Sequence, residues 1–117
     1  MFDSVHERDF WLACQAEGVP EPQTQYKFSK KRKYRADFAW PAQRVLVEIE
    51  GGEWIQGRHT RGGGFTRDCH KYNEAVRCGW RVLRFTGGMI VGDPCECARL
   101  VREVVEANGW TVEVIGG

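Results

Sequence analysis

The chain has 117 residues, of which 42% are hydrophobic, and a formal net charge of +1. That length supplies one hydrophobic core and not two, so we expect a single domain over residues 1–117. No stretch approaches 18 consecutive apolar residues and the first residues lack a secretory pattern, which predicts a cytoplasmic protein without membrane contact. The chain has five cysteines, and this odd number favours reduced thiols over a disulfide framework.

The first predicted helix covers residues 4–17. It opens with S-V-H-E, the pattern of a capping box, and the glycine and proline at 18 and 20 end it. Glu7 shares a helical face with Phe10, Trp11 and Cys14, which would direct it toward the core. Alternatively, Glu7 serves only as the capping-box acid.

A basic run begins within the first expected strand, at residues 24–28. It contains no acid and leads directly into the second strand, at 34–40; its members are Lys27, Lys30, Lys31, Arg32, Lys33 and Arg35. Residues 1–22 and 93–117 are both acidic, so residues 23–92 carry a net charge of +8, from 14 basic and six acidic residues. A positive centre of this kind attracts polyanions, and we expect the run to contact nucleic acid. The alternative is a solvated hairpin face.

Three carboxylates occupy the second and third strands, at 34–40 and 44–50. Side chains alternate along a strand, so Glu48 and Glu50 share one face of the third. If residues 41–44 form a tight turn, Asp37 falls opposite Glu48. Carboxylates this close repel one another unless a cation compensates them, and oxygen ligands suit Mg²⁺ or Mn²⁺. The alternative is a solvent-facing edge strand.

The remaining elements follow a loop with six glycines at 51–64. A helix is expected from 66 to 78, with an apolar stripe of Phe65, Cys69, Tyr72 and Val76. A strand at 80–85 would be reached by a crossover that leaves it parallel to an earlier strand. A last helix starts at Asp93 and Pro94 and closes at 108–109, with room for a short terminal strand after it. The glycines at 62–64 lack the G-K-[ST] of a phosphate loop, so no nucleotide cofactor is expected.

The order and motifs of these elements resemble the PD-(D/E)XK nuclease superfamily. R-A-D-F-A-W-P, V-E-I-E-G-G, R-H, R-D-x-x-K and G-W-R-V-L-R-F are similar to its very-short-patch-repair-endonuclease-like branch of small domains, over roughly residues 4–86. The resemblance implies an α/β fold with a mixed-sheet αβββαβ core flanked by helices, restriction-endonuclease-like. It also implies a Mg²⁺- or Mn²⁺-dependent endonuclease that hydrolyses DNA phosphodiester bonds, in a bacterium or phage.

The resemblance also implies roles for individual residues. Asp37, Glu48 and the carbonyl of Ile49 would hold the metal, and Glu7 would complete the site. Glu50 stands where the superfamily has Lys, and would act as general base or metal ligand. His59 would assist the chemistry or else contact a phosphate, and Lys71 would substitute for the missing cation. The positive charge of this part of the chain, rather than the resemblance, predicts contacts with the DNA backbone from Lys30, Lys31, Arg32, Lys33, Arg35, Arg58, Arg61 and Arg67.

The missing Lys motivates a second hypothesis, a nuclease-fold module that binds branched or single-stranded DNA and cuts it weakly or not at all. The sequence does not identify the DNA structure recognised. Processing of a junction or nick is one expectation, and a symmetric substrate would imply a homodimer.

Overall fold

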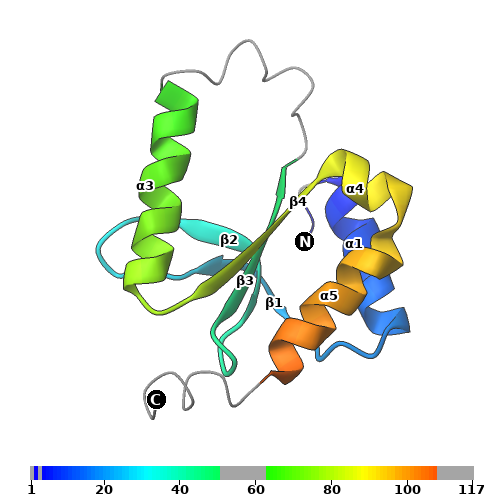
Figure 1. The fold of residues 1–117 in the computed structure, drawn as a ribbon. Helices are drawn as coiled ribbons and strands as arrows, with labels where there is room; N and C mark the ends of the chain where they lie inside the picture. The colour runs from blue at the N-terminus through cyan, green and yellow to red at the C-terminus, as the bar shows by residue number, and fades with distance from the viewer. Residues whose placement is uncertain (1, 3, 51–62, 108–117) are drawn as a thin grey trace.

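The computed structural model describes residues 2, 4–50 and 63–107. Its helices and strands are, in chain order, α1 Val5–Ala16, β1 Gln23–Lys27, β2 Arg35–Trp40, β3 Val45–Glu50, α3 Gly63–Arg77, β4 Arg81–Thr86, α4 Gly87–Gly92 and α5 Pro94–Glu106. The four strands form one sheet in the order β1-β2-β3-β4 (Figure 1). The first three strands are antiparallel and β4 is parallel to β3, so the predicted mixed α/β architecture is confirmed.

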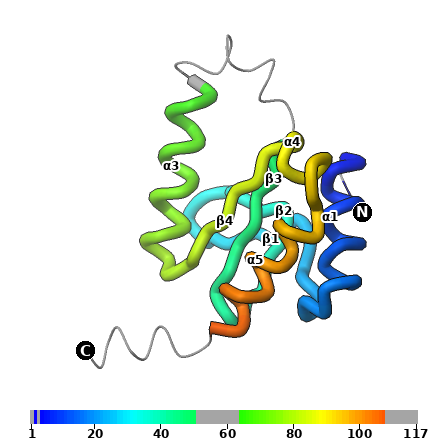
Figure 2. Tube along the Cα trace, turned by 45° about the vertical axis from the view of Figure 1, so that its right-hand side comes forward, coloured from blue at the N-terminus to red at the C-terminus, as the bar shows by residue number. Residues whose placement is uncertain are grey.

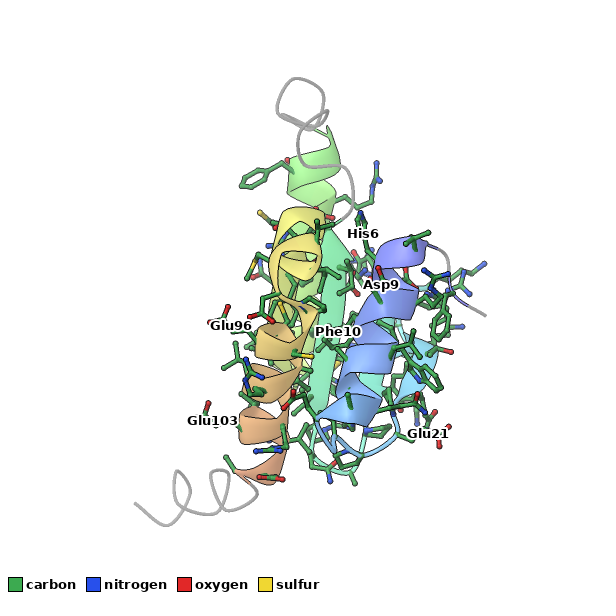
Figure 3. The ribbon with its side chains drawn as sticks, turned by 90° about the vertical axis from the view of Figure 1, so that its right-hand side faces the viewer. His6, Asp9, Phe10, Glu21, Glu96 and Glu103 are labelled. Atoms are coloured by element: carbon green, nitrogen blue, oxygen red, sulfur yellow. The ribbon has the colours of Figure 1, made fainter. Side chains whose placement is uncertain are left out.

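The sheet lies between two layers of helix. α1, α4 and α5 cover one face and α3 lies over the other, as two views of the chain agree (Figures 1 and 2). The first layer encloses an apolar core, in which the ring of Phe10 lies 5.0 Å from that of Phe38 and 5.8 Å from that of Phe85. Figure 3 shows Phe10 pointing between α1 and α5, whereas Glu96 and Glu103 project away from that contact. Burying such rings is the main favourable term for this face.

The opposite face has a smaller core of Phe28, Ala36, Ala39, Leu46, Ala75 and Trp80. The predicted apolar stripe of α3 is wrong: the side chains of Phe65 and Val76 are 65% and 67% exposed, and Cys69 is also exposed. Ala75 is the buried residue of α3 instead. The face of the sheet beneath α3 carries the strand carboxylates, so the helix turns polar side chains toward it.

Two predicted helix starts are confirmed. The Ser4 hydroxyl accepts a hydrogen bond from the Glu7 amide, and Asp93 caps α5 through the Glu96 amide with Pro94 in the first turn. The short helix α4 was not predicted from the sequence, because G-G-M-I-V-G has two leading glycines and poor helix propensity; it forms behind a capping Thr86. No helix in the described ranges is long and apolar enough to cross a membrane. A terminal strand would lie outside those ranges.

Cysteine positions fit the expectation of free thiols in part. Cys14 and Cys97 are buried and unbridged, and burial raises the pKa of the Cys14 thiol to about 12. Cys69 is unbridged but exposed, so it is not a core thiol.

Candidate carboxylate site beneath α3

The β2–β3 hairpin places Asp37 as expected from the sequence. The turn closes with hydrogen bonds from the Gln43 amide to the Trp40 carbonyl and from the Arg44 amide to the Pro41 carbonyl. The paired residues end at Phe38 opposite Val47, and one further step brings Asp37 to Glu48. Beyond that pair, a side chain rather than the backbone joins the two strands: the Ile49 amide donates a hydrogen bond to Asp37 Oδ2 at 2.8 Å. This contact fixes Asp37 beside the end of β3. The contact shown for Ile49 is made by its N–H, whereas the predicted metal ligand is its carbonyl.

Glu48 is buried and carries a partner from α3. Its Oε1 lies 3.1 Å from Lys71 Nζ, and its Oε2 is buried without a hydrogen-bond partner among the described residues. Desolvation by burial raises the pKa of Glu48 to about 7; Lys71 opposes that rise and the charge of Asp37 adds to it. The carboxylate is therefore undercompensated, which is the condition that a bound cation relieves.

Glu50 is held by two side chains that sequence reasoning did not assign to a site. Its Oε2 accepts a hydrogen bond from the Tyr72 hydroxyl at 3.0 Å and pairs with Arg84 at 3.1 Å. The Arg84 guanidinium also lies 4.2 Å from the centre of the Tyr72 ring. Burial and the charges of Glu48 and Glu50 raise the pKa of the Tyr72 hydroxyl, so it remains a hydrogen-bond donor at any ordinary pH. Glu50 is thus oriented, and not a freely exposed strand residue.

Gln25 joins the carboxylates of α1 and β2. Its side-chain amide lies 3.4 Å from Glu7 Oε1 and 3.5 Å from Asp37 Oδ1. Its backbone φ is 49°, in the left-handed region that is costly for a residue with a Cβ. Glu7 is only 5% exposed, so it does point inward from α1 in addition to lying at the capping position. Residues with strained backbone conformations cluster at functional sites, so Gln25 belongs to the candidate site.

The donor types suit a divalent cation, although the described side chains do not form a complete set of ligands. No group of three His, Cys, Asp or Glu residues within the described ranges is close enough to hold a metal ion by itself. Asp37 and Glu48 nevertheless face each other across adjacent strands, and the buried Glu48 Oε2 is without a partner there. Carboxylate oxygens of this kind fit Mg²⁺ or Mn²⁺ when water or phosphate supplies the remaining ligands.

The predicted DNA-contacting residues fall in two places. Exposed side chains lie in the β1–β2 loop and at the start of β2: Lys30, Lys31, Arg32, Lys33 and Arg35. Arg67 is exposed on α3. Arg58, His59 and Arg61 lie outside the described residues.

Three site residues were missed by sequence reasoning: Gln25, Tyr72 and Arg84. The Arg84 signal was present, since Arg84 is a charge inside a predicted strand and pairs in register with Glu48. The Gln25 signal was its position opposite Asp37. Paired residues of the antiparallel strands β1 and β2 have numbers with a constant sum, and 25 and 37 fit that sum. Tyr72 gave a misleading signal, because its helical spacing from other apolar residues is typical of a core-facing stripe.

Comparison with known proteins gives two weak similarities. The chain is 27% identical over 109 residues to the uncharacterized proteins MT2308 and Rv2248 of Mycobacterium tuberculosis, strains CDC 1551 and H37Rv. The match covers 91% of this chain and 39% of each relative, so the chain spans well under half their length. No known family matches the chain. No solved structure matches it either.

Proposed function

We propose that this chain is a restriction-endonuclease-like domain that hydrolyses DNA phosphodiester bonds with Mg²⁺ or Mn²⁺. The observation that carries the proposal is the pair formed by Lys71 and Glu48 beside Asp37. The motif of the third strand has Glu50 where the resembled superfamily has Lys. Lys71 supplies a cation to the same carboxylate cluster from α3, and so offers the charge that the strand lacks.

The side chains have separable roles in this proposal. Asp37 and Glu48 would hold the metal, which supplies Lewis-acid charge to the phosphate and lowers the pKa of attacking water. Lys71 is placed to offset negative charge that develops on the phosphate. Tyr72 and Arg84 orient Glu50, which can then accept a proton from water. His59 is the alternative residue for activating the water. Gln25 would hold Asp37 in position, and Glu7 would in turn fix the Gln25 side-chain amide.

A cleavage assay tests the proposal. Supercoiled, single-stranded and four-way-junction DNA are incubated with the chain in Mg²⁺ or Mn²⁺, with EDTA as the metal-free arm. Asp37→Asn and Glu48→Gln keep shape and remove one ligand charge, and each should slow cleavage by roughly a thousandfold or more. Glu103→Gln is the matched control, because Glu103 is an exposed acid directed away from the fold's core (Figure 3). Cleavage that survives in both site variants removes these carboxylates from the chemistry.

One observation favours a second function, a DNA-binding module without hydrolysis. Within the described ranges no three ligating side chains converge, and Lys71 already compensates part of the Glu48 charge. In that case the chain binds DNA equally in EDTA and Mn²⁺ and cuts none of the three substrates. Asp37→Asn would then strengthen binding slightly, because a negative charge has gone.

A further inference from the structure

A basic pocket lies at the opposite end of the sheet face that carries the carboxylates. It has a volume of about 770 Å³ and is bounded by β1, the β1–β2 loop, the residue before β3, the end of α3 and the connection from α3 to β4. The loop lies beside the C-terminal part of α3 in Figure 1. The cationic lining residues of the pocket are Lys27, Lys30, Lys31, Arg44 and Arg77, and none of its lining residues is an acid.

Most of these cations are not neutralised by a neighbouring carboxylate. Arg77 pairs with Glu74, which lies outside the pocket lining. Among the described residues, the three lysines and Arg44 form no ion pair with an acid. A concave surface with four such cations is a site for an anion.

The same pocket contains aromatic surface. Tyr26, Phe28 and Trp80 line it, and the Tyr26 and Trp80 rings meet edge-on at 5.6 Å. The Arg44 guanidinium lies 4.2 Å from the centre of the Trp80 ring and donates to the Cys78 carbonyl. Arg44 is exposed, so a ligand can reach its side chain from solvent. Nucleobases stack on arginine planes and aromatic rings.

The basic loop is held in place before any ligand arrives. Ser29 is 3% exposed, its hydroxyl donates to Glu74 at 2.7 Å, and it accepts from the Lys31 and Arg32 amides. Hydrogen bonds from Arg77 and from Ser29 lower the pKa of Glu74 to about 2, so Glu74 is ionised throughout the useful range. The loop is therefore tied to α3 by a charged hydrogen bond. Such order reduces the entropy cost of binding.

A second, smaller pocket lies beside the first, between the β1–β2 loop and α3. It has a volume of about 200 Å³ and shares Arg77 with the first; its other lining includes Arg32 and His70. Arg44, which lines the first pocket, and Glu48 are four residues apart along the chain, or about 13 Å at the rise of a strand. A short piece of polynucleotide would span that separation.

We propose that the basic pocket binds an unpaired nucleotide of a DNA strand whose neighbouring phosphates extend toward the carboxylates. The base stacks on the outer side of Arg44, and the lysines of the loop contact the phosphates. A paired base is buried in the duplex stack and cannot enter. The inference rests on the proposed function and narrows its substrate to DNA with a single-stranded segment.

Binding in EDTA tests this without any need for cleavage. The probes are a labelled single-stranded thymidylate oligonucleotide and a blunt duplex of equal length, measured by fluorescence anisotropy. Arg44→Lys keeps the charge but loses the flat stacking surface, and should weaken single-strand binding roughly tenfold with little effect on the duplex. Lys31→Gln is compared with Lys33→Gln, the same charge change in the same loop at a residue outside the pocket lining. Lys31→Gln should weaken single-strand binding more.

The outcomes separate the two proposals. Equal single-strand affinity in Lys31→Gln and Lys33→Gln, or a parent chain that prefers the duplex, overturns the pocket assignment. Thermal unfolding shows whether Arg44→Lys remains folded. If it does not, the comparison of Lys31→Gln with Lys33→Gln tests the pocket assignment on its own. Cleavage that requires Asp37 and Glu48 but shows no single-strand preference leaves the nuclease proposal standing alone. Single-strand binding that depends on the pocket, without cleavage of any substrate, would support the pocket assignment and overturn the nuclease proposal.

Discussion

Lys71 Nζ lies 3.1 Å from Glu48 Oε1, and the side chains are 19% and 11% exposed. The two residues come from α3 and β3 and meet because α3 lies over the carboxylate face of the sheet. The residue that lies beside Glu48 in space, Lys71, is thus a cation. The residue two positions further along β3, Glu50, is an anion. Partial burial strengthens the Coulomb attraction within this pair relative to a surface ion pair, but desolvation of Glu48 outweighs that gain and raises its pKa.

Replacing Lys71 tests whether its positive charge compensates the negative charge of Glu48. In Lys71→Met the carboxylate loses its partner, so the pKa of Glu48 rises further and cleavage falls by roughly a hundredfold or more. Lys71→Arg keeps the charge and should retain part of the activity. Cleavage rates and folding stability are measured together, because full activity in a folded Lys71→Met variant would refute a role for the cation.

Glu48 should make folding stability depend on pH. Its folded pKa of about 7 lies above the ordinary value of 4.5, so the folded state binds the proton more tightly than the unfolded state. Parent stability should therefore decline relative to Glu48→Gln as pH rises from 4.5 to 7, by up to about 3 kcal/mol. Urea unfolding of both chains in EDTA gives the difference. Parallel stability curves across that range would show that Glu48 is not buried as an ion.

Glu50→Gln tests whether the charge of Glu50 is needed. Glutamine still accepts the Tyr72 hydrogen bond but loses the pairing with Arg84, so cleavage should fall by roughly a hundredfold if Glu50 receives a proton or binds metal. Glu50→Lys should also be inactive, because it places a cation against Arg84. Near-full activity in Glu50→Gln would transfer the water-activating role to His59 or to the substrate.

Two substitutions at Gln25 should separate the contribution of its strained backbone from that of its side-chain amide. Gln25→Gly removes the amide but tolerates φ of 49°, whereas Gln25→Ala removes the amide and keeps the strain. Both should lower cleavage, and the glycine variant should be more stable than the alanine variant by about 1 kcal/mol. Cleavage that falls only in the glycine variant would assign the effect to the backbone, because only glycine relieves the strain at this position.

The exposed loop lysines should control the salt dependence of DNA binding. Changing Lys30, Lys31 and Lys33 together to Gln removes three cations that we expect to neutralise phosphates, so affinity should fall for every sequence. The slope of log affinity against log salt should flatten by roughly 0.9 for each phosphate that is no longer neutralised. Anisotropy titrations over a salt series measure the slope, and an unchanged slope would show that the loop is only a solvated face.

The local patterns of the sequence determined much of the sheet and its carboxylates. Alternation placed Glu48 and Glu50 on one face, the turn at 41–44 set the register that brings Asp37 opposite Glu48, and the crossover made β4 parallel. These features depend on short-range geometry, namely strand pleat, turn length and connection handedness, and the sequence carries them directly.

Only the tertiary structure decided which face of α3 meets the sheet. Amphipathic periodicity favoured Phe65 and Val76, yet the packed face contains Ala75 and presents Lys71 and Tyr72 to the strand acids. A helix rotates to match the surface that it covers, and that surface is assembled from strands distant in sequence. The same holds for Gln25 and Arg84, whose partners come from elements between 12 and 34 residues away. No short window of the sequence contains both members of those pairs.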